Sequence, residues 1–259
     1  MAIRIGVAGW SIGSALADCF PGDGTNLARY ARRFNAAEIN SSFYRPHRRA
    51  TYERWAASVP PDFRFAVKLP KSITHERRLA DCADLLDRFA DETGGLGEKR
   101  GPVLVQLPPS LIFDAAVAEA FFETFALALD ASMVIEPRHA TWFEPDVDRL
   151  LAEHRISRVA ADPAKLPAAA QPGGWTGLAY FRLHGAPRVY WSPYDEAAIA
   201  AQAEGIGAIE GRGLDSWTIY DNTASGAAIP NALALSERLD MNRAPRNANS
   251  LDPNITERS

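Results

Sequence analysis

Short apolar runs alternate with longer amphipathic stretches along most of the chain. The short runs are rich in Val, Ile, Leu and Phe and predict eight strands, at 3–9, 37–40, 63–68, 103–106, 133–136, 158–162, 178–184 and 217–221. The longer stretches have apolar residues at helical spacing and predict seven helices, at 26–34, 50–58, 79–92, 114–129, 145–154, 194–204 and 226–239. This alternation is typical of parallel βαβ units.

The alternation breaks twice. After the sixth predicted strand, residues 163–177 contain three prolines and the pair Gly173-Gly174, a composition that interrupts a helix, so we expect an irregular segment there. Residues 240–259 are rich in Asn, Arg, Pro and Ser and have no apolar period, which predicts a disordered C-terminal tail.

Two α/β architectures fit such alternating units. A doubly wound open sheet would place a glycine-rich phosphate-binding turn after the first strand, but residues 6–11 lack the required spacing and include the bulky Trp10. A TIM (β/α)8 barrel needs no such turn and often has about the length of this chain. The sequence therefore predicts a single TIM-barrel domain over residues 1–239.

Composition limits the classes of function. The net charge of -4 and pI of about 5.8 give no broad positive field, so nucleic-acid binding is not favoured. The only cysteines, Cys19 and Cys82, lack disulfide or metal-site spacing, which indicates a reducing compartment. A predicted strand starts at residue 3 and leaves no room for a signal peptide, and no apolar run is long enough to span a membrane. We therefore expect a cytoplasmic protein.

Polar side chains recur at the carboxyl ends of the predicted strands. Strand residues alternate in direction, so the last inward residue of each barrel strand points to the mouth, where TIM-barrel enzymes place their sites. Apolar residues would fill this mouth at a lower desolvation cost, so the repeated polar groups predict a functional site. The candidate catalytic residues are Glu136, Asp162, Lys68 and His184. The candidate substrate-binding residues are Glu38, Asn40, Tyr44, His75, Gln106, Arg138, Arg182 and Asn222.

A structural role is the alternative for each charged residue, because a buried charge needs a partner. We expect Lys68 to be ion-paired with Glu38, Glu136 or Asp162 and to stay charged at neutral pH. Either Asp221 or Asn222 points inward at the end of the last strand, and the sequence leaves this choice open. The basic and aromatic groups predict a small anionic or sugar-like ligand, with no metal and no cofactor.

Several short motifs occur in a family-specific order. They are EINSSFY at 38–44, FRFAVK at 63–68, ITHE at 73–76, QLPP at 106–109, EPRH at 136–139, RLHG at 182–185 and DNT at 221–223. In these motifs the chain resembles the YecE-like family, domain of unknown function 72, from residue 3 to about residue 239. The resemblance implies a TIM barrel and specifies no activity. It also places Asp221 where many relatives have Asn, so a role for that side chain is open.

The leading hypothesis is an enzyme in which Glu136 or Asp162 acts as acid or base and Lys68, Arg138 and Arg182 hold negative charge. Lys68 could instead form a Schiff base, although a lysine flanked by carboxylates keeps its proton. A divalent-metal isomerase or endonuclease-like barrel would bind its ion through Glu38, Glu136, Asp162 and His184, next to repelling cations. A glycosidase would need a second carboxylate where strand four offers only Gln106. A non-catalytic protein could bind a ligand or nucleic acid through Arg45, Arg48, Arg49, Arg77 and Arg78.

Overall fold

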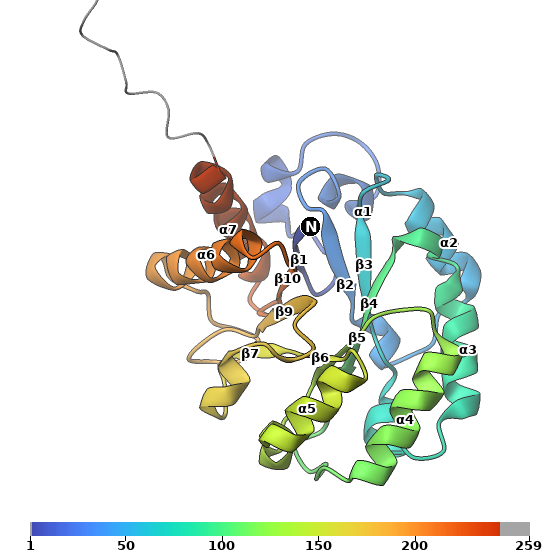
Figure 1. Ribbon diagram of the computed structural model, residues 1–259. Helices are drawn as coiled ribbons and strands as arrows, with labels where there is room; N and C mark the ends of the chain where they lie inside the picture. The colour runs from blue at the N-terminus through green and yellow to red at the C-terminus, as the bar shows by residue number, and fades with distance from the viewer. Residues whose placement is uncertain (1, 244–259) are drawn as a thin grey trace, which may run out of the picture.

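The computed structural model describes residues 2–243, in which helices surround a central group of strands (Figure 1). The strands are β1 (Ile3–Val7), β2 (Ala36–Ile39), β3 (Arg64–Lys68), β4 (Arg100–Gln106), β5 (Met133–Glu136), β6 (Ser157–Arg158), β7 (Ala160–Asp162), β8 (Gly173–Gly174), β9 (Leu178–Leu183) and β10 (Asp215–Tyr220). The helices are α1 (Asn26–Tyr30), α2 (Arg49–Ala57), α3 (Ala83–Gly94), α4 (Ala115–Ala128), α5 (Pro145–Glu153), α6 (Glu196–Gly211) and α7 (Ala228–Arg243).

The strands form two sheets. One has the order β1-β10-β9-β7 and the other the order β2-β3-β4-β5-β6-β8, and all pairs are parallel except β6 with β8. At one junction, Ala8 and Glu38 form a parallel bridge. At the other, β6 pairs with β5 while β7, which follows it in the chain, pairs with β9. The structure is thus an α/β fold with parallel sheets.

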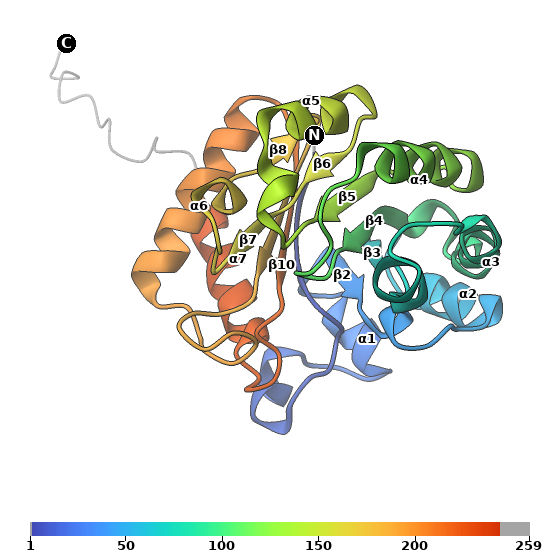
Figure 2. The same ribbon diagram turned by 90° about the horizontal axis from the view of Figure 1, so that it is seen from below.

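The helices lie outside the strands, as the view from below shows (Figure 2). Helices α2, α3 and α4 lie beside the second sheet, and α6 and α7 lie on the side of β9 and β10. Four helices differ from their predicted bounds by four residues or more: α1 ends at Tyr30, α3 begins at Ala83, and α6 and α7 are longer than predicted. Helix α6 continues past Gly205 because Ile206 is buried and extends its apolar face, and α7 reaches Arg243. The predicted tail therefore loses residues 240–243, and 244–259 lie outside the described residues.

The segment after β7 is irregular, as its prolines and glycines predict. It contains only the one-turn helix η6 (Pro167–Ala170) and the two-residue strand β8. A cavity of about 660 Å³ lies here, between α6 and the outer side of β7 and β9. No helix within residues 2–243 combines the length and apolar character that a membrane span requires.

Alternation along the strands divides the buried apolar side chains into two groups. The larger group packs between the strands and the helices. The smaller lies on the inner side of the strands and consists of Ala36, Ala66, Leu104, Val134, Val159, Leu178, Tyr180, Trp217 and Ile219. Within it, the rings of Tyr180 and Trp217 stack with their centroids 6.0 Å apart. This inner group supports the polar residues that follow on the same strands.

Candidate functional site

A buried polar layer lies next to the inner apolar group, toward the carboxyl ends of the strands. Side chains two residues apart on a strand point to the same face, so each polar residue follows an inner apolar one by two positions. The polar residues are Glu38 on β2, Lys68 on β3, Gln106 on β4, Glu136 on β5, Arg182 on β9 and Asp221 directly after β10. Each of them is at most 5% exposed. The structure thus brings together side chains from strands far apart in sequence.

Arg182 is fully buried at the centre of this layer. Its Nε and Nη2 atoms donate to the two carboxylate oxygens of Glu38 at 3.0 and 2.8 Å, which is a bidentate pair. Its Nη1 atom donates to Glu136 at 2.6 Å, and Nη2 also donates to Asp221 at 2.9 Å. The Tyr180 hydroxyl donates a further hydrogen bond to Glu38 at 3.0 Å. One guanidinium therefore bridges three carboxylates and reduces the repulsion among them.

Arg182 was expected to bind a ligand, and the structure places its side chain in a fully buried position. Its side chain is 0% exposed, and both Nη atoms and Nε already donate to protein carboxylates. Arg182 therefore holds the carboxylates in place beneath the site, and a ligand would have to meet other cations.

Glu136 receives hydrogen bonds from several sides. Besides Arg182, Arg138 donates to its Oε1 atom through Nε at 3.2 Å and through Nη2 at 3.0 Å. Gln106 Nε2 donates to the same oxygen at 3.3 Å. Burial acts to raise the pKa of Glu136, but the charges of Arg182 and His184 outweigh it and hold the pKa well below its usual range. Glu136 is therefore ionised and is a weak general base.

His184 lies between two of the carboxylates and is 4% exposed. Its Nδ1 atom is 3.1 Å from Asp221 Oδ2, and its Nε2 atom is 3.3 Å from Glu136 Oε1. Burial acts to lower the pKa of His184, yet the Glu136 carboxylate and the hydrogen bonds to both acids raise it overall. The pKa of Asp221 is lowered despite burial, chiefly by Arg182. The cluster is thus a network of ionised groups.

Lys68 contradicts the expectation of an ion pair. Among residues 2–243 no carboxylate oxygen lies within 4.0 Å of its Nζ atom, because Arg182 occupies the position between Glu38 and Glu136. The ammonium instead lies over the ring of Phe43, 4.1 Å from the centroid. Burial, and then the charge of Arg182, lower the pKa of Lys68 to about 8, although the surrounding carboxylates act to raise it.

The groups at the more accessible side of the cluster are basic and aromatic. Arg138 is 26% exposed in its side chain and donates to the hydroxyl of Tyr190 at 3.1 Å. The imidazole of His75 contacts the edge of Phe43, with centroids 5.0 Å apart. Burial, and then the charges of Lys68 and Arg138, lower the pKa of His75. His75 is therefore neutral at pH 7 and close to both cations.

The predicted binding residues Asn40 and Tyr44 lie in different surroundings. Asn40 follows β2, and its Oδ1 atom is buried without a hydrogen-bond partner among the described residues. Tyr44 is 69% exposed and contacts the cluster only through the ring of Phe43, at 5.0 Å between centroids. The structure thus places a free acceptor near the site and leaves Tyr44 on the outside.

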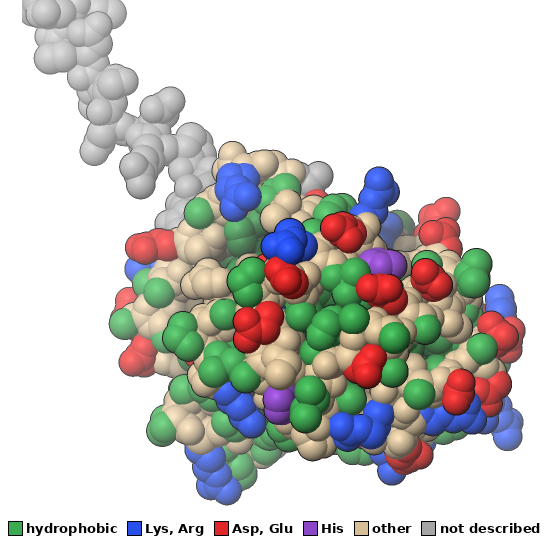
Figure 3. Space-filling view, turned by 60° about the horizontal axis from the view of Figure 1, so that its bottom comes forward, with side chains coloured by type: hydrophobic (Ala, Val, Ile, Leu, Met, Phe, Trp, Pro, Cys, Tyr) green, Lys and Arg blue, Asp and Glu red, His purple; other side chains and the backbone are tan. Residues whose placement is uncertain are grey.

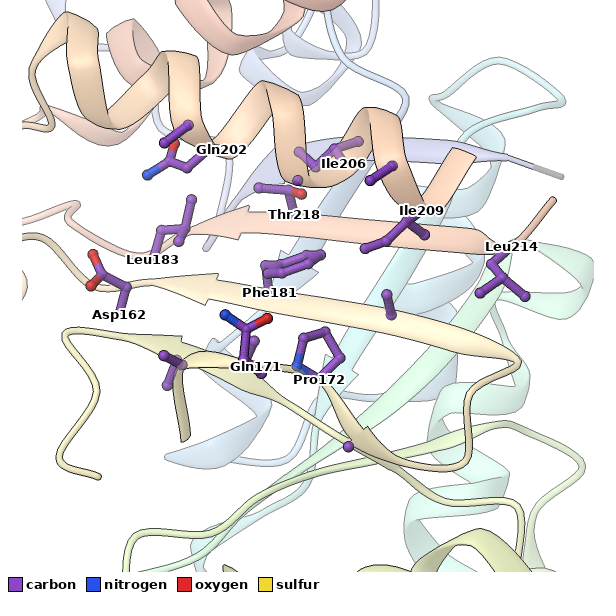
Figure 4. A pocket seen from close by; sticks show the side chains of 18 of the residues that line it. Asp162, Gln171, Pro172, Phe181, Leu183, Gln202, Ile206, Ile209, Leu214 and Thr218 are labelled. Atoms are coloured by element: carbon purple, nitrogen blue, oxygen red, sulfur yellow. The ribbon is translucent and has the colours of Figure 1, made fainter. Parts of the chain in front are cut away.

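Asp162 lies on the opposite face, which corrects its predicted place in the cluster. In the pairing of β7 with β9, Ala161 is level with Arg182, and Asp162 is level with the outward Leu183. Neighbouring strand residues in register point to the same side, so Ala161 takes the inward position. Figure 4 shows Asp162 beside Leu183 in the cavity under α6. The sequence-based assignment took the last residue of this strand as the inward one, whereas Val159 and, two positions later, Ala161 are the inward residues.

The structure also decides between Asp221 and Asn222. Asp221 points inward to the cluster, whereas Asn222 donates to the carbonyl of Ser192 and to Asn231 Oδ1, both at 2.9 Å. These bonds hold the loop after β9, where a side chain on Gly185 would overlap the Ser192 carbonyl. Asn222 therefore has a structural position, and Asp221 is the site residue that the sequence left undecided.

The polar cluster borders a cavity of about 300 Å³. Glu136, Arg138 and His184 line one part of it, and Ala161 and Phe143 line another. This volume suits a small molecule. Within residues 2–243 no group of three or more His, Cys, Asp or Glu side chains is arranged to hold a metal ion. The guanidinium of Arg182 takes the central place that a cation would need among the carboxylates.

Comparison with known proteins identifies the family. The model of the family described as "Protein of unknown function DUF72" matches residues 4–255. The chain belongs to the DUF72 family. This confirms the family resemblance inferred from the motifs.

The DUF72 relatives described next share between 22% and 30% sequence identity with this chain. The UPF0759 protein YecE of Escherichia coli K12 is 30% identical over 151 residues, which cover 56% of this chain and 55% of the relative. The chain thus spans about half the length of the curated relatives it matches. A DUF72 crystal structure from Enterococcus faecalis has a TM-score of 0.78 and 22% identity and covers 92% of this chain and 96% of its own. One from Thermotoga maritima has a TM-score of 0.76 and 23% identity, with coverage of 93% and 100%. These structures support the fold alone.

Proposed function

We propose that the polar cluster is the active site of an enzyme that acts on a small anionic molecule. The proposal rests on one observation: the carboxylates of the cluster are buried, whereas one of its cations is accessible. The side chains of Glu38, Glu136 and Asp221 are 0%, 2% and 6% exposed, and the buried Arg182 pairs with all three. Arg138 is 26% exposed and lies on the accessible side. An approaching ligand would therefore meet Arg138 before the buried carboxylates.

In this proposal Arg138 binds the negative group of the substrate. Its guanidinium is oriented by Glu136 and by the Tyr190 hydroxyl, so part of the entropic cost of binding is met before the ligand arrives. Proton transfer is assigned to two groups other than Glu136, whose lowered pKa makes it a weak base. These are His184, held between two carboxylates, and Lys68.

We also infer that the two sheets act as one TIM (β/α)8 barrel. The parallel bridge at Ala8 and the shared segment 157–162 support this inference, as does the polar layer at the carboxyl ends of the strands. Both cysteines are free thiols, Cys19 exposed and Cys82 buried, and this supports a cytoplasmic location.

The alternatives receive less support. A metal-dependent enzyme would need Asp162, which faces the other side, and carboxylates that Arg182 already engages. Nucleic-acid binding would need a broad positive face, but acidic and basic side chains are both spread over the face in Figure 3. Arg77 also pairs with Asp84 at 2.7 Å, which reduces the basic rim.

Anion titration tests the proposal. We expect inorganic phosphate to bind at low ionic strength, measured by calorimetry or NMR, and Arg138→Gln to weaken binding about tenfold or more because charge-assisted hydrogen bonds are lost. Arg149→Gln is the matched control, since Arg149 lies on α5, is 69% exposed and pairs only with Asp146 among the described residues. Equal affinity of the two variants would contradict the proposal. A thermal-shift screen of small phosphates and carboxylates then addresses the substrate.

A further inference from the structure

Lys68 differs from the other cations of the cluster. Arg138, Arg182 and His184 each contact a carboxylate within 3.3 Å, whereas Lys68 has no carboxylate within 4.0 Å among the described residues. Its residue is 5% exposed, and its Nζ atom lies on the face of Phe43. A structural role would pair the buried ammonium, because an unpaired buried charge is costly. No carboxylate hydrogen bond therefore holds Lys68 in its protonated form. Once the proton is lost, the electron pair of the amine is free to react.

Lysine is also rare in this chain. Of 28 basic residues only four are lysines, at positions 68, 71, 99 and 165. Lys71 pairs with Glu76 at 3.3 Å, and Lys99 donates to the carbonyls of Val59 and Pro60 at 2.5 and 2.6 Å. In the cluster, arginine side chains form the ion pairs with the buried carboxylates. The basic residue at the end of β3 is therefore a lysine, which can lose its proton, and not an arginine, which cannot.

The surroundings favour the neutral amine. Burial and Arg182 lower the pKa of Lys68 to about 8, against 10.5 ordinarily. Roughly a tenth of the molecules then carry a neutral amine at pH 7, compared with about three in ten thousand for an ordinary lysine. The ring of Phe43 stabilises the ammonium, but this attraction is smaller than the desolvation. His75 is neutral beside it and can accept the proton.

We propose that Lys68 is the nucleophile of this site and forms an imine with a small aldehyde or ketone that carries a carboxylate or phosphate. The inference rests on the proposed function, because Arg138 would hold the negative group while Lys68 meets the carbonyl carbon. An amine freed from its proton by burial and by a neighbouring cation is a known way to activate lysine. The substrate class follows from the pairing of a nucleophilic amine with an anion-binding guanidinium.

The chemical step balances without any further reagent. The Lys68 electron pair forms a C–N bond to the carbonyl carbon, and the carbonyl π electrons move to oxygen, which takes up a proton. The nitrogen of this carbinolamine loses one proton and the hydroxyl takes up a second. The nitrogen electron pair then forms the C=N bond as the C–O bond breaks and water leaves, so the product is a protonated imine. His75 accepts the first proton, and His184, whose pKa the neighbouring Glu136 and Asp221 raise, is the proton donor on the other side of the cluster.

Reductive trapping tests the inference in the intact protein. The chain is incubated at pH 7 with glyoxylate and sodium cyanoborohydride, and the carboxymethylated lysines are quantified by peptide mass spectrometry. We expect Lys68 to react at least tenfold faster than Lys71, although Lys71 is 51% exposed and accessibility alone would give the reverse order. The comparison within one molecule needs no variant. Lys68→Arg should remove the fast adduct, and Lys71→Arg should retain it.

A neutral aldehyde separates this inference from the proposed function. Arg138→Gln should slow the labelling of Lys68 by glyoxylate at least tenfold more than it slows the labelling by acetaldehyde, because acetaldehyde has no negative group for Arg138 to bind. If Lys68 reacts no faster than Lys71 with either aldehyde, the imine is overturned, while phosphate binding through Arg138 would keep the anion site. If Lys68 reacts fast regardless of Arg138, the nucleophile is supported and the anion site fails.

Discussion

Replacement of Lys68 by methionine should stabilise the protein at pH 7. Methionine keeps an unbranched side chain against Phe43 and removes the buried charge. A residue that closes an ion pair would behave in the opposite way, because breaking a buried pair costs about 3–5 kcal/mol. A decrease in stability on replacement would therefore indicate a structural lysine. An increase would indicate a lysine whose charged state is unfavourable in the fold and is kept for function.

The magnitude follows from the environment of the amine. A pKa lowered from 10.5 to about 8 means that the folded protein disfavours the ammonium. Each pKa unit corresponds to about 1.4 kcal/mol, so the charged state costs about 3 kcal/mol in the fold at neutral pH. Loss of the contact with the Phe43 ring offsets about 1 kcal/mol of this. We expect Lys68→Met to raise the free energy of unfolding by about 2 kcal/mol.

The dependence on pH provides a second readout. Between the lowered pKa of about 8 and the ordinary 10.5, the unfolded chain binds more protons at this position than the folded protein does. The stability of the wild type therefore rises with pH in this window relative to Lys68→Met, and the advantage of the variant disappears near pH 10.5. Urea denaturation of both proteins at pH 7, 8.5 and 10 measures the difference.

The control is Lys71→Met, which removes an exposed lysine and should change stability by less than about 0.5 kcal/mol. Loss of 3 kcal/mol or more in Lys68→Met at pH 7, or a difference that does not change with pH, would refute the reasoning and restore the ion-pair interpretation.

Four further outcomes are expected. Arg182→Lys should destabilise the fold by about 3–5 kcal/mol in urea denaturation, because an ammonium cannot reproduce a guanidinium that bridges three buried carboxylates. The pKa values of Glu136 and Asp221 are lowered in the fold, so their stabilisation is present above about pH 4.5 and is lost as the pH falls below it, which a urea series from pH 6 to pH 2.5 should show. The pKa of His184 is raised, so its contribution is complete below 6.5 and is lost as the pH rises through the raised value. Asp162→Asn should leave phosphate affinity unchanged in calorimetry, and a loss comparable to that of Arg138→Gln would place Asp162 in the site after all.

The sequence by itself determined the order of elements and most of the polar layer. Periods of two and 3.6 residues are local properties, and they placed the seven helices and all the strands except β8, although the single strand predicted at 158–162 is divided into β6 and β7. The alternation along a strand also decided that Glu38, Lys68 and Glu136 share a side, because each follows an apolar inward residue by two positions. The interruption after β7 was visible in its prolines and glycines.

Only the tertiary structure decided which charged side chains point into the cluster and which of them form ion pairs. Asp162 and Ala161 are equally compatible with a short strand, and only the register against β9 points Ala161 inward. Lys68 and Arg182 are both cations at strand ends, but the guanidinium can bridge Glu38, Glu136 and Asp221 at once, so the carboxylates face Arg182 and leave the lysine unpaired. Such choices depend on distances between strands that are far apart in the chain. The local pattern sets which way a side chain points, and only the assembled fold sets its partners and thereby its pKa.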